Sequence, residues 1–137
     1  MRTVGDVMRS PVVVATPTST ATDLVSLRRQ HGIQHFPVVE DGRIVGIVTD
    51  RNLREAVTDP RVFTLLLDLI ASMDRVVVRD IMVRDVVTAN RDVPLPEAAR
   101  LMVERKIGCL PIVEEGRVVG IVTATDILAV VAAGGSA

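Results

Sequence analysis

The stretch FPVVEDGRIVGIVT, residues 36–49, is repeated 74 positions later as LPIVEEGRVVGIVT, residues 110–123. When residues 6–57 are aligned with residues 80–131 without a gap, 18 of the 52 pairs are identical, far above chance for this composition. Two copies of this length cannot form a repeat array. We therefore expect a pseudo-two-fold domain in which each half covers the exposed sheet face of the other.

Both copies predict the same first two elements. A short strand is expected over residues 11–15 and again over residues 85–89. A helix follows each strand. In the first copy Thr20 or Thr22 can cap it, and in the second copy Pro96 suits its first turn. Residues at helical spacing continue each helix: Leu24, Leu27 and His31 in the first, and Ala98, Leu101, Met102 and Arg105 in the second.

A hairpin and a second helix complete each copy. Residues 36–40 and 44–49 are apolar runs joined by Asp41-Gly42, a pair that favours a two-residue turn, and Glu115-Gly116 takes its place in the second copy. Another helix is expected directly after Thr49 and after Thr123. Each repeat is therefore predicted to be β-α-β-β-α, and the fold class α+β.

The amino-acid composition excludes several classes of function. Of 137 residues 48% are hydrophobic, two are aromatic, and the formal net charge is −1. The absence of a basic stripe and the scarcity of aromatic residues disfavour nucleic-acid binding. One cysteine excludes an internal disulfide. The start lacks the apolar run of a signal peptide, and no stretch is long enough to span a bilayer, so we expect a cytoplasmic protein without membrane contact.

The predicted organisation is one integrated domain. We place repeat 1 at residues 1–58, a helical insert at 59–79, repeat 2 at 80–133 and a flexible tail at 134–137. The insert begins with the turn signal TDPR, and residues 62–73 are apolar on nearly all sides of a helix. Such a helix must be buried, either in the core of this chain or against a second subunit.

These residues together resemble a known family. Each repeat has D-[VI]-M at its start, [FL]-P-[VI]-V in the first hairpin strand and G-I-V-T-x-x-[ND] at the exit to the last helix. The chain resembles a tandem cystathionine-β-synthase (CBS) domain pair, or Bateman module, and within it the bacterial AcuB-type members. The resemblance implies two clefts that bind AMP, ADP, ATP or S-adenosylmethionine, and a module that regulates a partner rather than catalysing a reaction.

The exit motif allows two interpretations. Thr49 and Thr123 stand where strand becomes helix, and Asn52 and Asp126 follow three residues later, which is the spacing of a capping box. A carboxylate there could equally accept two hydrogen bonds from the vicinal hydroxyls of a ribose. Capping alone is the simpler interpretation, and the family resemblance favours a ribose contact at Asp126.

The two copies differ at this motif. The second has Thr125 beside Asp126, which matches the family's full pattern, whereas the first has Arg51 beside Asn52. An amide has one acceptor oxygen, so Asn52 cannot hold both hydroxyls as a carboxylate can. Arg51 suits a phosphate. We therefore expect the stronger site around Asp126.

The resemblance also implies where the adenine lies. It would contact the first strand of each repeat and the segment before the P-[VI]-V strand, through backbone groups. The residues are Val87, Thr88, Ala89, Gly108, Leu110 and Pro111 in one cleft, and Val13, Val14, Ala15, Gln34, Phe36 and Pro37 in the other. The alternative for all of these is plain core packing.

His35 holds a position where family members often carry a basic residue directed at phosphates, and Cys109 holds the matching place in the second copy. We expect His35 to contact phosphate in the Asp126 cleft, although a lone histidine is more often structural. His31 is expected to be an exposed helix residue.

No catalytic signature, P-loop or metal-binding motif is present, so an enzyme is not expected. Two classes remain: an adenosyl-nucleotide sensor that modulates a separate protein in trans, and an interaction scaffold with empty clefts. The retention of Thr123, Thr125 and Asp126 favours the sensor. A homodimer is expected, formed through the apolar insert and the last helix, residues 126–133.

Overall fold

The computed structural model describes residues 2–57 and 75–134. The chain divides into two compact units. Unit 1 contains Met1–Val12 and Val87–Ala137, and unit 2 contains Val13–Val86. Each unit therefore combines the opening segment of one sequence repeat with the hairpin of the other. The linear boundaries at residues 58, 79 and 133 stay predictions, as does the packing of one half on the other.

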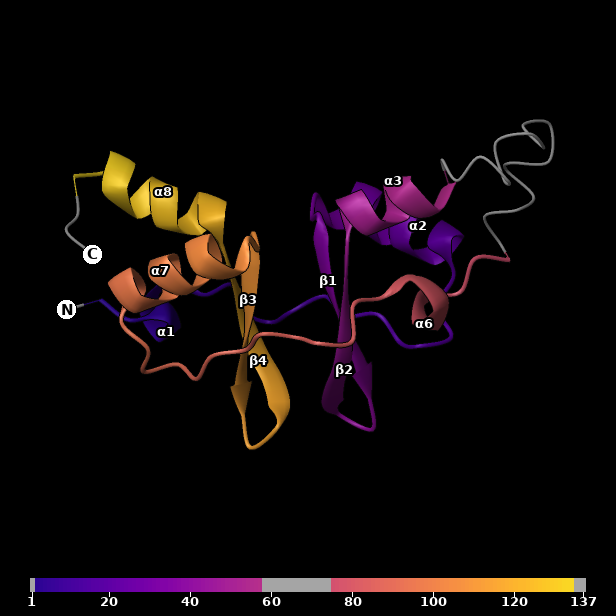
Figure 1. Ribbon diagram of the computed structural model, residues 1–137, viewed down its shortest axis with the longest axis horizontal. Coiled ribbons are helices and arrows are strands. Elements are labelled where there is room, and N and C mark those ends of the chain that lie inside the picture. The colour runs from indigo at the N-terminus through magenta and orange to yellow at the C-terminus, as the bar shows by residue number, and fades with distance from the viewer. Residues whose placement is uncertain (1, 58–74, 135–137) are drawn as a thin grey trace. The chain divides into compact units, whose positions relative to one another are not determined.

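Both units contain the same set of elements (Figure 1). Unit 1 has α1 (Val4–Val7), α7 (Leu95–Arg105), β3 (Cys109–Glu114), β4 (Arg117–Thr123) and α8 (Ala124–Ala132). Unit 2 has α2 (Ala21–His31), β1 (His35–Glu40), β2 (Arg43–Thr49), α3 (Asp50–Val57) and α6 (Val78–Ile81). The predicted α+β class is confirmed.

The hairpins form as predicted. Asp41 and Gly42 have φ values of 53° and 79°, and Glu115 and Gly116 have 52° and 80°. Positive φ at both central residues is the turn that matches the twist of the strands, and it explains the glycine in each pair. Both hairpins carry a register shift at the same place, between Val38 and Val39 in one and at the matching pair in the other.

The helices that precede the hairpins are also confirmed. Thr20, rather than Thr22, caps α2, and its hydroxyl accepts a hydrogen bond from the amide of Asp23. Helix α2 ends at Gly32 in the left-handed conformation, with φ of 66°. Pro96 lies in the first turn of α7, where a missing N–H leaves no helical bond unmade.

The prediction of a strand at the start of each repeat is wrong, because only one residue of each segment pairs with the hairpin. Residues 11–15 and 85–89 contain no strand, and only Ala15 and Ala89 form isolated parallel bridges, to Val38 and Ile112. The amide of Ala15 donates to the carbonyl of Pro37, and Ala15 accepts from Val39. The next rung would need an N–H from residue 37, which proline lacks. A proline at position 111 ends the second ladder in the same way.

Each unit has its own apolar core. In unit 1 it lies between the hairpin and helices α7 and α8, and in unit 2 between the hairpin and helices α2 and α3 (Figure 1). Leu95, Leu110, Ile112 and Val122 are fully buried in the first, and Leu24, Phe36, Val38 and Val48 in the second.

The predicted insert helix over residues 62–73, and the TDPR turn before it, lie outside the described residues. Within residues 2–57 and 75–134, no helix is long and apolar enough to cross a membrane.

The methionine of each D-[VI]-M motif packs against a glycine, Met82 against Gly46 and Met8 against Gly120. A Cβ on Gly46 would lie 2.9 Å from Cγ of Met82, and a Cβ on Gly120 would lie 2.9 Å from Cγ of Met8. The methionine side chain therefore rests directly on the strand backbone.

Candidate functional site

The start of α8 forms a complete capping box. The hydroxyl of Thr123 accepts a hydrogen bond from the amide of Asp126 at 3.2 Å, and Oδ2 of Asp126 accepts from the amide of Thr123 at 2.9 Å. The capping interpretation of the exit motif is therefore confirmed. Each carboxylate oxygen has two lone pairs, so this arrangement leaves further acceptor positions on Asp126. The ribose contact stays a prediction.

The second oxygen of Asp126 has a partner that sequence reasoning missed. Nε of Arg9 lies 3.2 Å from Oδ1 of Asp126. The side chain of Asp126 is 11% exposed and that of Arg9 is 60% exposed, so the acid is sheltered and the base reaches it from the surface. The two residues are 117 positions apart. No local pattern could pair them, because the opening segment belongs to the unit of the second hairpin.

The start of α3 has the same cap with an amide. Oδ1 of Asn52 accepts from the amide of Thr49 at 2.9 Å and from its hydroxyl at 3.1 Å. The single acceptor oxygen is thus used twice. Arg51 lies on the exposed face of the helix, where its Nε is 3.1 Å from Oε1 of Glu55. Its expected phosphate contact stays a prediction.

The segment before each hairpin is tied to the adjacent helix start. The carbonyl of Gly108 accepts from the amide of Ala124 at 2.9 Å, and the carbonyl of Gln34 accepts from the amide of Asp50 at 2.9 Å. Gly108 is thereby held next to Thr123 and Thr125, the latter exposed in the first turn of α8. In unit 1 the structure therefore brings together the predicted glycine, two threonines and the acid.

Half of the twelve residues proposed for adenine are buried in the core. Leu110, Pro111 and Pro37 are fully buried, and Ala15 and Ala89 are buried with their backbone groups bonded to the hairpin. Core packing is thus confirmed for these side chains, and a ligand could reach only their backbone. Val14, Gln34 and Gly108 are exposed and Thr88 is half-buried, so contact with a base falls to these positions first.

His35 and Cys109 begin β1 and β3 and lie opposite Thr49 and Thr123 in the strand registers. His35, in unit 2, is half-buried, and its phosphate contact stays a prediction. His31 is exposed at the end of α2, as expected. Cys109 is 4% exposed, and burial raises the pKa of its thiol to about 12. A neutral, buried thiol is a packing residue.

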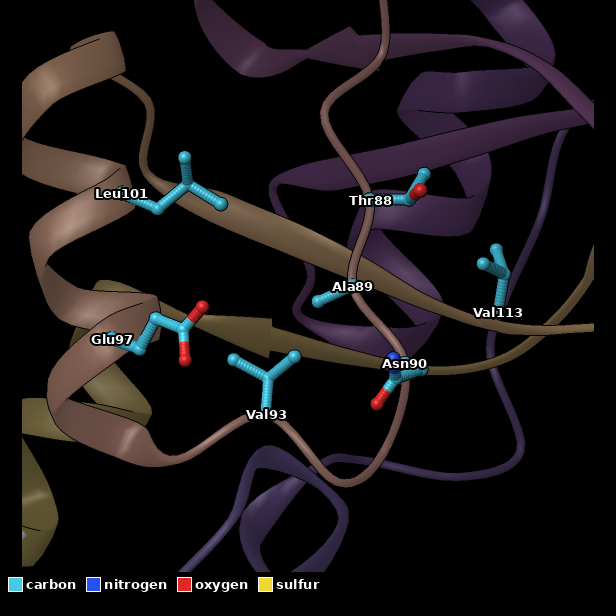
Figure 2. A pocket seen from close by; sticks show the side chains of 7 residues that line it. All are labelled: Thr88, Ala89, Asn90, Val93, Glu97, Leu101 and Val113. Carbon is cyan, nitrogen blue, oxygen red and sulfur yellow. The ribbon is translucent and has the colours of Figure 1, made fainter.

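Unit 1 also has an open pocket of about 400 Å³ between helix α7 and the segment that leads into it. Figure 2 shows Glu97 and Leu101 on successive turns of the helix, with Val93 and Asn90 opposite them. Two predicted residues, Thr88 and Ala89, line this pocket together with Val113. Neither Thr123 nor Asp126 lines it. Asn90, Val93, Glu97, Leu101 and Val113 were not predicted to line a site, and for Leu101 helical spacing had indicated only the core face of the helix.

Known proteins share this sequence pattern and this fold. The CBS-domain profile matches residues 4–59 and 78–133. The protein MK0525 of Methanopyrus kandleri is 38% identical over 129 residues, which make up 93% of this chain and 61% of MK0525. The chain thus spans less than two thirds of that relative.

Solved structures match over almost the whole chain. The CBS domain pair of protein MJ0100, crystallised with 5′-methylthioadenosine and S-adenosyl-L-methionine, has a TM-score of 0.82 at 27% identity, with 98% of each chain covered. CBSX2 in complex with AMP has a TM-score of 0.79 at 28% identity, covering 97% of this chain and 98% of CBSX2.

The resemblance to AcuB-type members is confirmed at the level of the fold and the tandem pair. A Vibrio cholerae protein described as an acetoin utilization protein (AcuB) has a TM-score of 0.77 at 27% identity, covering 97% of this chain and 92% of that chain. Because the profile matches both repeats, the chain belongs to the CBS-domain family and carries a tandem pair of the domain.

Proposed function

We propose that the chain is an adenosyl-nucleotide-binding regulatory module that modulates a partner protein by binding rather than by catalysis. The observation that carries the proposal is the Asp126 carboxylate. It is 11% exposed, held rigidly by the capping box of α8, and retains acceptor positions for two hydroxyl groups. Thr125 and the Gly108 segment flank it.

The comparisons support the chemical class of the ligand. Two CBS pairs with the same fold are crystallised with AMP, or with 5′-methylthioadenosine and S-adenosyl-L-methionine. All three compounds contain an adenosyl group whose ribose carries 2′ and 3′ hydroxyls. AMP, ADP and ATP are our first candidates, and S-adenosylmethionine is the second because the MJ0100 pair holds it.

A thermal-shift series tests this proposal. We expect at least one of AMP, ADP, ATP and S-adenosylmethionine to raise the melting temperature, because a ligand at 100 times its dissociation constant adds about 2.7 kcal/mol to the free energy of unfolding. Inorganic phosphate and cytidine monophosphate serve as controls for ionic strength and for the base. No response to any adenosyl compound would contradict the proposal and favour the scaffold.

We propose that a second copy of the chain covers the exposed apolar face of helices α7 and α8. Val103, Leu128 and Val131 are 77%, 66% and 57% exposed, and the last two lie three residues apart on one helix face. Burying each of these apolar side chains would stabilise the dimer by about 1.5–3 kcal/mol. A charged side chain at one of these positions would lose that stabilisation and oppose association.

Leu128→Glu is therefore expected to convert a homodimer to a monomer in light scattering at micromolar concentration. Val83→Glu, at an exposed apolar side chain of unit 2, is the matched control and should leave the dimer intact. A monomeric native chain would contradict the assignment.

A further inference from the structure

The ion pair between Arg9 and Asp126 joins the predicted ribose acid to a cation that lies outside the exit motif. Nε of Arg9 donates to Oδ1 of Asp126 at 3.2 Å. The backbone of Arg9 is fixed at the same time, because its amide and carbonyl exchange hydrogen bonds with Ile121 at 2.9 and 3.2 Å. Arg9 is thus anchored on β4, two residues before Thr123.

The other repeat provides an internal comparison. Position 83 lies 74 residues after Arg9, and the amide and carbonyl of Val83 exchange the same hydrogen bonds with Ile47, at 2.8 and 2.9 Å. The backbone is therefore equivalent in the two units, but the pair of side chains is Val83 and Asn52 instead of Arg9 and Asp126. The fold needs neither charge at these positions. The acid and the base occur together in one unit, which indicates a function that both serve.

The hydrogen-bonding groups of Arg9 and Asp126 suit a ligand that carries both a ribose and an anionic group. Oδ2 of Asp126 accepts one hydrogen bond, from Thr123, and Oδ1 accepts one, from Arg9. One acceptor position remains on each oxygen, which suffices for the two hydroxyls of a ribose. Arg9 uses Nε for this contact, so its terminal nitrogens are available to a second anion, and guanidinium binds phosphate through such paired N–H groups.

We propose that Arg9 makes the Asp126 site select a 5′-phosphorylated nucleoside over the uncharged nucleoside. The inference rests on the proposed function, since it assumes that the ribose binds Asp126. The Arg9 side chain is 60% exposed and long, so it can turn from Oδ1 toward a phosphate carried by the same ribose. An uncharged nucleoside carries no anion for this cation to bind, so it gains nothing from Arg9.

Calorimetric titration with adenosine and with AMP tests the proposal on the full chain. We expect the native chain to bind AMP more tightly than adenosine. Arg9→Met should weaken AMP binding by about 10- to 100-fold, as expected for the loss of a charged hydrogen-bond partner, and leave adenosine binding unchanged or stronger. Arg9→Lys keeps the charge but loses the forked geometry, so it should retain part of the preference for AMP.

Arg100→Met, an exposed position on α7 with the same change in net charge, is the control and should change neither affinity. The inference is overturned if Arg9→Met weakens adenosine and AMP equally, if it weakens neither, or if the control reproduces its effect. In each of those cases adenosine still binds and the proposed function stands. Failure of both ligands to bind the native chain would overturn this inference, and the proposed function would fall with it only if ADP, ATP and S-adenosylmethionine also gave no thermal shift.

Discussion

Replacing Asp126 by asparagine is expected to weaken the binding of adenosine by about 10- to 100-fold and to leave the fold intact. The expected loss follows from the second acceptor oxygen, which an amide lacks. The fold should survive because the other repeat already carries this residue. The Oδ1 atom of Asn52 accepts from the amide of Thr49 at 2.9 Å, the same distance as in the Asp126 cap.

Adenosine is the right probe for this variant, because AMP would also report on Arg9. Calorimetric titration gives the affinity, and urea unfolding shows whether stability is retained. Asp23→Asn is a matched control: Asp23 closes the same capping box with Thr20 at the start of α2, at 2.9 and 3.2 Å. Equal adenosine affinity in the native chain and in Asp126→Asn would show that the ribose lies elsewhere, with the pocket around Glu97 the next candidate.

The free energy of unfolding is expected to fall steeply with pH above about 9, by about 1.4 kcal/mol per pH unit, because of Cys109. Burial raises the pKa of this thiol from 9.0 to about 12. Between these values the unfolded chain loses the proton and the folded chain keeps it, so alkaline conditions favour unfolding. Below pH 9 the thiol is protonated in both states, and its contribution to stability does not vary with pH.

This chain is well suited to the measurement. It has no tyrosine and a single lysine, so few other groups titrate in the same interval. Urea unfolding at several pH values between 8 and 11 should show the slope in the native chain and lose it in Cys109→Ala. Lys106→Arg, which removes the exposed lysine, should keep the slope. An unchanged slope in Cys109→Ala would show that the buried thiol is not its source.

The repeated stretch was sufficient to predict the hairpins, because its strand pattern and turn residues are local signals. Asp41-Gly42 and Glu115-Gly116 specify a turn through their own backbone conformations. The caps at Thr20 and Thr123 are local in the same sense. These elements depend on residues that lie within a few positions of each other.

The predictions that failed or were missed depend on distant residues. The opening strands end early because Pro37 and Pro111, on the neighbouring strands, cannot donate the next hydrogen bond. Arg9 was missed because its segment joins the unit of the second hairpin, a pairing that the linear repeat conceals. Glu97 was missed because a charged residue on an amphipathic helix is usually only a solvated surface position.

A crystal structure of the chain grown with excess AMP tests the central claim most directly. We expect both ribose hydroxyls to bind the carboxylate of Asp126, with the cap to Thr123 preserved. AMP bound away from Asp126, or a carboxylate that in its presence contacts only Thr123 and Arg9, would contradict it.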